Sequence, residues 1–359
     1  MKNPFLEKIE GTDKEFLTSK CSVNRVVLNK LPVYGVYDDA EGKTAYDIFS
    51  TTAVIEEIIN SKISDIVDLS KIDDVDYARY LGIWLNGKNN TLAKIAMDIM
   101  KDFGNRLGLI LLTLKLGEPE NRACRSDWTD EHWEYWKNIK TVVLAGGLAT
   151  GVQGKILKQQ VEYVFSLVGE KPYDIIVFDN PSYAGVMGCV KKIKCSDGTH
   201  IVLDFGQTNI KRSIVKLNDG EIIWVQTLPS ISSINMNSYD TSEKSAIQLH
   251  QYLVNAVAKT FREAVKEGAV GSEIVISIAN YVKGDNLYSD RGGYGKLALI
   301  GEHYAKILEE DCSSELRQPV KITLIHDGTA MALWFSDYKD TVCLSLGTAF
   351  GVGFPEINV

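Results

Sequence analysis

The sequence predicts an α/β protein built of two lobes. At 359 residues the chain is long for one domain and comfortable for two. Short apolar runs of strand length alternate with longer stretches of helical periodicity. Two of the apolar runs end in turns rich in glycine and threonine, "LDFGQTN" and "LSLGTAFGVGF". Turns of this kind after a strand are typical of phosphate-binding sites.

Composition and charge argue against several classes of protein. A hydrophobic content of 45% and a charged content of 24% are ordinary for a soluble globular protein. The net charge of -8 argues against a nucleic-acid partner, and six cysteines without a C-x-x-C pair argue against zinc fingers and a disulfide framework. The N-terminal segment lacks the apolar core of a signal peptide, and the run "LGLILLTLKLG" is too short to span a bilayer. We therefore predict a soluble, cytoplasmic protein.

The second half of the chain is predicted to contain five strands and three helices. In order these are strands at 200–206, 210–217 and 220–228, a helix at 242–267, a strand at 273–279, a helix at 296–310, a strand at 320–325 and a helix from 327 onward. The turn "NDG" separates the second strand from the third. This order resembles the ribonuclease-H-like order of one lobe in the actin and hexokinase superfamily.

The first half is predicted to be helical in its middle and α/β at its end. Its expected elements are strands at 22–28 and 33–38, helices at 46–60, 70–85, 91–115 and 129–136, a strand at 141–145, a helix at 153–168, a strand at 173–180 and a helix at 182–193. The segment "WTDEHWEYW" is expected to pack in the core rather than to bind a ligand. The polar stretch "KCSDGTH" at 194–200 is the candidate linker between the halves.

The hairpin "LDFGQTNIKRS" is the first candidate site. Asp204 ends its first strand, and Gly206, Gln207, Thr208 and Asn209 form the turn. Small residues at such a turn let backbone N–H groups approach phosphate oxygens, and a carboxylate beside it can hold the water shell of Mg²⁺. Taken alone, the motif is equally compatible with a structural hairpin.

Two further motifs add to this site. "LSLGTAFGVGF" is a second predicted hairpin, with Gly347 and Thr348 at its turn. "LIHDGTAMA" places Asp327 at the end of a strand that leads into a helix. A carboxylate there can take the proton from an attacking hydroxyl during phosphoryl transfer. Each motif alone is compatible with a hairpin or a helix cap, but the three together favour a functional site.

These motifs resemble those of the ROK sugar kinases and hexokinases. "DFGQTNIKRS" resembles their D-x-G-G-T stretch, "LIHDGTAMAL" their N-D-A-N-A-A-A segment and "LSLGTAFGVGF" their L-G-T-G-x-G-x-G stretch. "KTVVLAGGLATG" resembles their adenosine-binding turn, which would be Gly146 and Gly147 here, and "DNPSYAGVMGCVKKI" resembles their final segment. The resemblance implies two ribonuclease-H-like lobes with a nucleotide cleft between them, and ATP and Mg²⁺ as cofactors.

The order of the motifs resembles a circular permutation of that family. The adenosine turn and the closing helix come first in this chain, and the second phosphate hairpin comes last. Residues 1–182, completed by 341–359, would form the nucleotide lobe, and 183–340 the substrate and catalytic lobe. We expect 342–346 to lie beside the strand of "TVVLAGG", the strands at 22–28 and 33–38 to continue that sheet, and both termini to fall on this lobe.

The resemblance implies an ATP-dependent kinase that transfers the γ-phosphate to a hydroxyl of a small, sugar-like molecule. Asp327 would be the general base and Asp204 the metal ligand. His326 would contact the substrate, and so would Asp290 and Arg291, from the segment "NLYSDRGGYG". The phosphate-binding residues implied are Gly206, Gln207, Thr208, Asn209, Gly347 and Thr348.

Two departures from the family pattern keep other functions open. Gln207 stands where the family has glycine, and His326 stands where it has asparagine. They are compatible with a catalytically silent nucleotide or sugar sensor, or a scaffold, of the same fold. An ATPase or an acyl-phosphate-forming kinase would use the same loops with another acceptor. The expected partner is a small molecule rather than a nucleic acid or a membrane, and a homodimer is compatible with the sequence.

Overall fold

The computed structural model describes residues 2–233, 240–288 and 293–358, and the chain divides into two compact units. Unit 1 comprises Met1–Phe5, Lys20–Pro181 and Tyr338–Val352, and unit 2 comprises Leu6–Ser19, Ser182–Asp337 and Gly353–Val359. The chain therefore passes from unit 1 to unit 2 at Pro181 and Ser182. The predicted linker at 194–200 lies wholly within unit 2, where the backbone N–H groups of Lys194 and Cys195 donate to Glu273. The prediction that this stretch separates the halves is wrong.

Unit 2 is built on a five-stranded sheet. Its strands are β5 (Gly198–Phe205), β6 (Asn209–Asn218), β7 (Glu221–Ser232), β8 (Val270–Ile278) and β11 (Lys321–His326), in the spatial order β11-β8-β5-β6-β7. Strands β5, β6 and β7 are antiparallel, whereas β8 runs parallel to β5 and β11 runs parallel to β8. This is the ribonuclease-H-like order that the sequence predicts.

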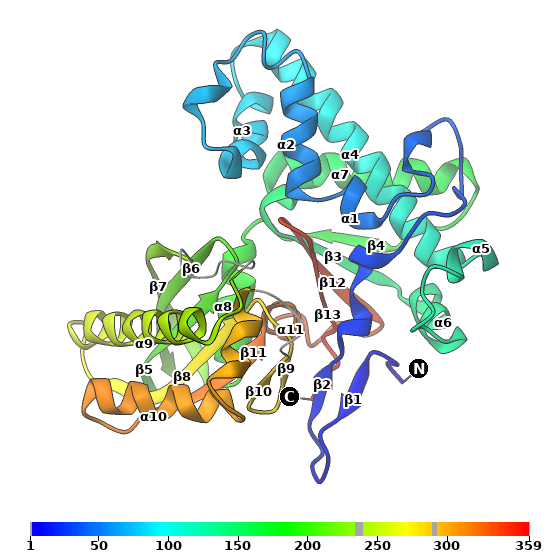
Figure 1. The fold of residues 1–359 in the computed structure, drawn as a ribbon. Coiled ribbons are helices and arrows are strands. Elements are labelled where there is room, and N and C mark those ends of the chain that lie inside the picture. Colours follow the sequence, from blue (N-terminus) through cyan, green and yellow to red (C-terminus); the bar gives the residue numbers. More distant parts are fainter. Residues whose placement is uncertain (1, 234–239, 289–292, 359) are drawn as a thin grey trace. The chain divides into compact units, whose positions relative to one another are not determined.

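Four helices accompany this sheet: α8 (Pro181–Val190), α9 (Glu243–Val265), α10 (Tyr304–Leu316) and α11 (Asp327–Leu333). Helices α9 and α10 pack side by side (Figure 1). The helix predicted at 296–310 is wrong in its bounds, because a 3₁₀ helix at Gly293–Leu299 precedes α10. Gly301 and His303 have positive φ angles and interrupt the helical path between the two.

The two faces of this sheet carry different side chains because strand residues alternate between faces. On β5, Leu203 and Phe205 belong to the apolar core that includes residues of α9 and α10. Asp204 lies between them and therefore points to the other face. There the buried thiol of Cys189 on α8 is hydrogen-bonded to Ser277 of β8. Asp204, Ser277 and Cys189 thus lie on the face of the sheet that α8 occupies.

Unit 1 contains a four-stranded sheet. Its strands are β3 (Thr141–Ala145), β4 (Asp174–Val177), β12 (Thr341–Leu346) and β13 (Phe350–Gly353), in the order β13-β12-β3-β4. Strands β12, β3 and β4 are parallel, and Val342 is in register with Val142. The prediction that 342–346 lies beside the strand of "TVVLAGG" is confirmed.

The helices of unit 1 come mostly from the region before β3. They are α1 (Ala45–Ile48), α2 (Thr51–Asn60), α3 (Tyr77–Leu85), α4 (Asn90–Leu116), α5 (Pro119–Arg122), α6 (Asp130–Asn138) and α7 (Gly151–Leu167). Helices α4 and α7 touch through two glycines of α4: a Cβ on Gly104 would come within 2.5 Å of Gln160 Cβ, and one on Gly108 within 2.8 Å of Val164 Cβ. The predicted helix at 46–60 is divided where the Ser50 hydroxyl caps α2.

The strands predicted at 22–28 and 33–38 are wrong. Val23–Arg25 and Asp38–Ala40 are short 3₁₀ helices, and Val27 makes only an isolated bridge with Thr44. Gly35 has a φ of +80°, which no regular strand contains. These residues therefore do not extend the sheet of unit 1.

Two short hairpins escaped prediction, and both belong to unit 2. One pairs β1 (Leu6–Lys8) with β2 (Glu15–Leu17), and the other pairs β9 (Val282–Lys283) with β10 (Asn286–Leu287). The backbone N–H of Glu15 donates to the Asn358 carbonyl (2.6 Å), which ties the segment near the C-terminus to the first hairpin. The expectation that both ends of the chain lie with the strand of "TVVLAGG" is wrong for these segments.

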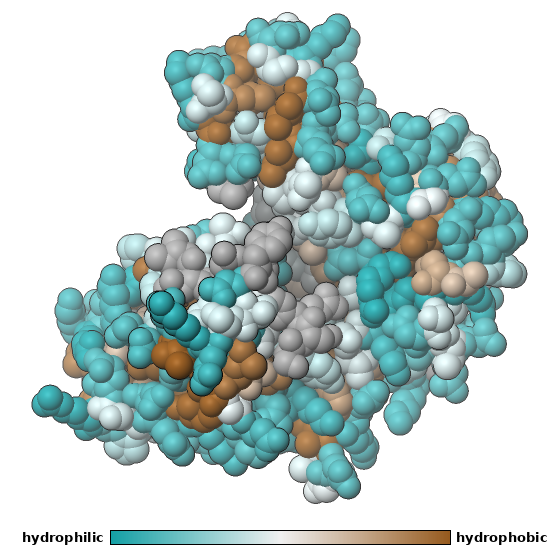
Figure 2. Space-filling view, viewed as in Figure 1, coloured by the Kyte–Doolittle hydropathy of each residue, from teal (hydrophilic) through white to brown (hydrophobic). Residues whose placement is uncertain are grey.

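The face shown in Figure 2 is mainly hydrophilic, with scattered apolar patches. The tryptophan-rich segment does not contribute to them, because Trp128, Trp133 and Trp136 are buried, as predicted for core residues. Among the described residues no helix combines the length and the apolar character needed to cross a membrane.

Candidate functional site

Asp204 is held by two neighbouring strands of unit 2. It stands in register with Lys211 on β6 and with Ser277 on β8. The Ser277 hydroxyl donates to Oδ1 (2.7 Å) and the Lys211 ammonium donates to Oδ2 (3.1 Å). With 17% of its side chain exposed, the Asp204 carboxylate is mostly shielded from water, so these bonds fix its orientation.

Lys211 and Ser277 were not nominated from the sequence, although signals for both exist. If "DFGQTNI" turns as a hairpin, Phe205 pairs with Ile210, and Lys211 must then face Asp204. Ser277 is the one hydroxyl in the apolar run "IVISIA". A polar residue in an otherwise buried strand needs a partner, and here that partner is Asp204.

The turn after Asp204 is held at Gly206 by hydrogen bonds, and its next three residues are exposed. Two hydroxyls donate to the Gly206 carbonyl, that of Ser233 (2.8 Å) and that of Tyr294 (2.9 Å). A Cβ on Gly206 would lie 2.8 Å from the Asn209 carbonyl oxygen, so glycine is required for this tight turn. The three predicted phosphate-binding residues that follow, Gln207, Thr208 and Asn209, are exposed. They are therefore accessible to a ligand.

Asp327 is the first residue of α11, directly after β11. Its Oδ1 accepts the backbone N–H of Gly328 (2.7 Å), and 41% of its side chain is exposed. Burial of the carboxyl group, with the negative charge of Asp204 as a further cause, raises the pKa of Asp327 to about 7. A carboxyl group with this pKa, on a side chain that is partly accessible to solvent, is suited to accept a proton near neutral pH.

His326 is turned toward the protein on both sides of its ring. Its Nδ1 accepts the backbone N–H of Thr329 (3.2 Å), and its Nε2 lies 3.2 Å from Oδ1 of Asp327. Tyr281 stacks on the ring with 4.7 Å between centroids and an interplanar angle of 8°. The side chain is only 9% exposed. The structure thus brings His326 to Asp327, and a direct contact between His326 and substrate stays a prediction.

Close backbone packing holds the start of α11 in place. A Cβ on Gly353 would overlap the Gly328 carbonyl, and a Cβ on Gly188 of α8 would overlap the Ala330 carbonyl. The last residue of β13 and the helix α8 therefore both pack against the first turn of α11, which begins at Asp327. This packing restricts the position of the Asp327 backbone.

In unit 1 the structure brings together the other four predicted ligand residues. Gly146 follows β3 with a φ of +102°, and a Cβ there would overlap the backbone of Leu346 at the end of β12. Gly147 and Thr348 are exposed, and Gly347 is half-buried. The Gly347 carbonyl accepts the backbone N–H of Thr51 at the start of α2 (3.0 Å). The predicted adenosine turn and the predicted second phosphate turn are neighbours in space.

The predicted substrate residues Asp290 and Arg291 lie outside the described residues. Tyr288 and Gly293, which flank them, are described. The Tyr288 carbonyl accepts from the Asn280 amide (2.9 Å), and the Tyr288 ring meets Tyr281 edge to face. The strand ends around Asp327 are therefore lined by aromatic rings.

The protein side chains at this site could hold Mg²⁺ only if the nucleotide and water supplied most of its ligands. Among the described residues no group of three or more His, Cys, Asp or Glu side chains is arranged to hold a metal ion. Mg²⁺ in phosphoryl-transfer sites often uses one or two carboxylates together with phosphates and water. Asp204 fits such a role as a single carboxylate, and the ammonium of Lys211 adds a positive charge next to it.

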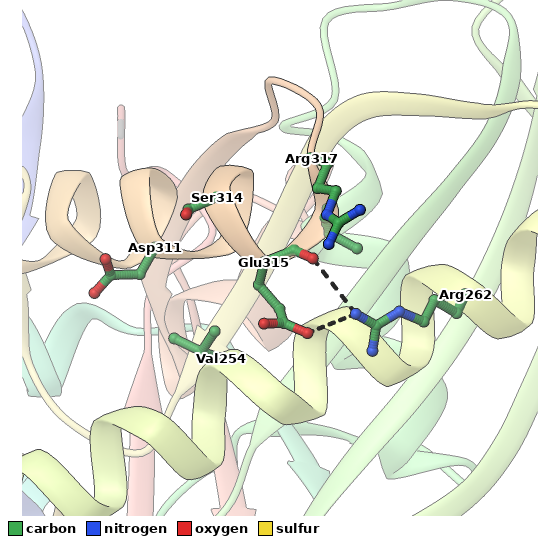
Figure 3. A pocket seen from close by; sticks show the side chains of 7 residues that line it. Val254, Arg262, Asp311, Ser314, Glu315 and Arg317 are labelled. Atoms are coloured by element: carbon green, nitrogen blue, oxygen red, sulfur yellow. Dashed lines mark hydrogen bonds and ion pairs between the residues drawn. The ribbon is translucent and has the colours of Figure 1, made fainter.

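A surface pocket of about 540 Å³ lies elsewhere, between α9 and α10 (Figure 3). It is lined by Val254, Arg262, Asp311, Ser314, Glu315, Leu316 and Arg317. The Arg262 guanidinium donates to the Glu315 carboxylate (2.5 Å), so these two charges are paired with each other. None of the residues predicted to carry chemistry lines this pocket.

The sheet order of unit 2 and the two-unit organisation define the class: an α/β protein with a ribonuclease-H-like lobe. No family model matches the sequence, and no curated protein matches it. Among solved structures, the ethanolamine utilization protein EutJ from Carboxydothermus hydrogenoformans is similar at 14% identity and a TM-score of 0.32 over 55% of this chain and 64% of that chain. The Ppx/GppA phosphatase from Aquifex aeolicus is similar at 12% identity and a TM-score of 0.29 over 69% of this chain and 84% of that chain.

A PilM-PilN type IV pilus biogenesis complex is similar at 14% identity and a TM-score of 0.28, over 49% of this chain and 49% of that chain. This chain thus spans less than two thirds of the EutJ structure and about half of the PilM-PilN structure. Similarity at this level concerns fold alone. The resemblance to the ROK kinases depends on the sequence motifs alone.

Proposed function

We propose that this protein binds ATP with Mg²⁺ and transfers the γ-phosphate to a hydroxyl of a small, sugar-like molecule. One observation carries the proposal. Asp327 directly follows β11 with a partly exposed side chain, and its carboxyl group, whose pKa is raised to about 7, interacts electrostatically with Asp204 and Lys211. Carboxyl groups with such shifted pKa values occur preferentially at catalytic sites.

Asp327 would act as the general base. The acceptor hydroxyl attacks the γ-phosphorus, its O–H bond breaks, and the proton passes to the Asp327 carboxylate as the phosphoryl group leaves ADP. At neutral pH a carboxyl group with a pKa of about 7 is ionised in roughly half of the molecules and still basic enough to bind the proton. A carboxylate with an ordinary pKa would be a weaker base.

The phosphates and the metal ion would be held mainly by the hairpin of β5 and β6. Its turn residues Gln207, Thr208 and Asn209 are exposed, and Gly206 is anchored through its carbonyl. Mg²⁺ on Asp204 would neutralise charge on the phosphates. We assign Gly347 and Thr348 to the phosphates as well, and Gly146 and Gly147 to adenosine, on the resemblance of their motifs.

The test is a screen in two stages. Melting temperatures are first measured with Mg·ATP, with Mg·ADP and with each member of a panel of sugars and small alcohols. Phosphoryl transfer to each acceptor is then followed by ³¹P NMR. The proposal predicts stabilisation by Mg·ATP and transfer to at least one sugar-like hydroxyl. Transfer to a carboxylate would instead identify an acyl-phosphate-forming kinase, and release of inorganic phosphate without an acceptor would identify an ATPase.

A silent sensor or scaffold would give a different pattern. It would be stabilised by nucleotide or sugar but would transfer no phosphate under any condition of the panel. Gln207 and His326 are the residues that favour this alternative, because they depart from the kinase motifs. Gln207→Gly is the matched control for this alternative, because it removes the exposed side chain by which this turn departs from the kinase motif.

A further inference from the structure

The ring of His326 serves as the cap of α11. Its Nδ1 accepts the backbone N–H of Thr329 (3.2 Å), and the Thr329 hydroxyl is also close to that nitrogen (3.3 Å). A backbone N–H can only donate, so Nδ1 must carry a lone pair and not a proton. The neutral ring therefore carries its hydrogen on Nε2.

The same ring reaches the proposed base. Nε2 of His326 lies 3.2 Å from Oδ1 of Asp327, and the backbone N–H of Gly328 donates to that oxygen as well (2.7 Å). The His326 ring and the Gly328 N–H therefore both interact with the same carboxylate oxygen, Oδ1. The second oxygen, Oδ2, is then the one suited to take a proton from an acceptor.

Stacking against one face of the His326 ring fixes the plane of the ring. Tyr281 stacks on it nearly parallel, with 4.7 Å between the centroids. Tyr281 is itself held next to Asn280, whose Oδ1 accepts the Tyr281 backbone N–H (2.9 Å) and whose amide donates to Tyr288 (2.9 Å). Because one ring nitrogen accepts a hydrogen bond and one ring face stacks on Tyr281, the His326 ring has few other orientations.

We infer that His326 is a positioning residue for Asp327. It stays neutral, donates from Nε2 to Oδ1 of Asp327, and so presents Oδ2 to the acceptor hydroxyl. The inference rests on the proposed function for its catalytic meaning, but the hydrogen position that it states can be measured without any activity. Histidine at the position where the kinase motif has asparagine keeps a side-chain acceptor that can cap the helix.

Two substitutions separate the cap from the donor. In His326→Asn the amide oxygen can take the place of Nδ1 and keep the cap, but the side chain is too short to place a donor where Nε2 lies. In His326→Gln the amide nitrogen can approach the position of Nε2, whereas the cap is lost. If His326 had only a structural role, the activity of each variant would depend only on whether the helix cap is kept.

The first experiment is ¹⁵N NMR of the histidine rings in the whole protein, with His326→Asn used to assign the signal. We expect the signal of an unprotonated, hydrogen-bonded Nδ1 and a protonated Nε2. In Asp327→Asn, where the carboxylate charge is lost, the Nε2 resonance should shift while Nδ1 stays an acceptor. A proton on Nδ1 in the wild-type protein, or an Nε2 signal that does not respond to Asp327→Asn, would overturn the inference.

The second experiment compares melting temperature with the rate of γ-phosphate loss from Mg·ATP, with the best acceptor of the panel or with water. His326→Asn should keep the melting temperature and lower the rate by roughly ten- to a hundredfold, the usual effect of removing a group that orients a functional side chain. His326→Gln should lower the melting temperature and keep more of the rate. A wild-type rate in His326→Asn would show that the ring is only a cap. If the wild-type protein turns over no ATP at all, the proposed function fails, and the NMR result decides the hydrogen position by itself.

Discussion

Each unit has a strand pair whose glycine-containing turn is a predicted phosphate-binding site, β5–β6 in unit 2 and β12–β13 in unit 1. The sequences "LDFGQTN" and "LSLGTAF" align so that Asp204 corresponds to Ser345 and Gly206 to Gly347. In both pairs the first strand runs beside a parallel strand, β8 for one and β3 for the other. The two hairpins therefore share a three-residue turn and a parallel neighbour of their first strand.

The side chains around the two turns differ. Asp204 is bonded to Ser277 and Lys211, whereas Ser345 stands in register with Ala145 and carries no charge. The close backbone approach is at Gly206 in the first hairpin, and at Gly146, on the neighbouring strand, in the second. The charged and hydrogen-bonded side chains thus lie around the turn of unit 2, whereas Ser345 in the corresponding hairpin of unit 1 is uncharged.

The largest expected effect tests where the chemistry lies. Asp327→Ala should lower phosphoryl transfer by roughly 10²–10⁴-fold, the usual contribution of a positioned general base, and should retain nucleotide binding. Ser345→Ala in the corresponding hairpin is the matched control and should leave the rate within about twofold of wild type. Rates are measured under saturating Mg·ATP. Near-normal transfer in Asp327→Ala would show that another group is the base.

A second contrast concerns the glycines of unit 1. Gly146→Ala should destabilise the protein by about 2–5 kcal/mol, because the positive φ disfavours alanine and the new methyl group would overlap the Leu346 backbone. Gly147→Ala is the control, since a Cβ there meets no atom within 4 Å. Urea unfolding measures both. Equal stability of the two variants would contradict the close approach of β3 and β12.

The third prediction concerns nucleotide binding by the second hairpin. Saturating Mg·ATP should stabilise the folded protein by about 2–4 kcal/mol, because the ligand binds only the folded state. Thr348→Trp should remove this stabilisation by filling the space at the turn, whereas the nearly isosteric Thr348→Val should keep most of it. Thermal unfolding with and without nucleotide provides the comparison. If Thr348→Trp is stabilised as strongly as the wild type, the turn of unit 1 does not contact the nucleotide.

A smaller effect connects the two carboxyl groups of unit 2. The negative charge of Asp204 is one cause of the raised pKa of Asp327, so Asp204→Asn should lower that pKa from about 7 toward its ordinary value of 3.8. Ser345→Ala should not change it. ¹³C NMR of the Asp327 carboxyl group measures the pKa in each variant. An unchanged pKa in Asp204→Asn would mean that burial alone causes the shift.

The same shift has a consequence for stability. Because the folded pKa of Asp327 is higher than the unfolded value of 3.8, the folded state binds this proton more tightly. The favourable contribution is therefore complete below pH 4 and is lost as the pH rises through about 7. Asp327→Asn should make the melting temperature less dependent on pH in this interval. A steeper dependence in the variant would contradict the sign of the shift.

Much of unit 2 could be predicted because its strands are apolar runs separated by clear turn residues. The turn "NDG", with Asp219 and Gly220 at positive φ, and the buried strand that ends at Asp327 are examples. Lys211 and Ser277 were missed because their roles depend on register between strands, which single residues do not reveal. His326 could be recognised as a departure, but only the structure shows that its ring meets Asp327.

Unit 1 was harder to predict, for physical reasons. The apolar residues of 22–28 resemble a strand, but tertiary packing buries Val23, Val26 and Leu28 without strand pairing. The hairpin of β1 and β2 has only three residues in each strand, too few to show a clear strand pattern in the sequence. The pairing of β12 with β3 could be predicted only from the order of motifs along the whole chain. No local pattern indicates it, because 195 residues separate the end of β3 at Ala145 from the start of β12 at Thr341.

In the proposed reaction Asp327 takes the proton during phosphoryl transfer. The most direct measurement is the pH dependence of transfer from Mg·ATP to the best acceptor, followed by ³¹P NMR in the wild-type protein and in Asp327→Asn. The account predicts that the wild-type rate rises with pH through the pKa of about 7 and that Asp327→Asn loses both the rate and this rise. A wild-type rate that is flat across this interval, or an Asp327→Asn variant that keeps the same rising profile, would contradict it.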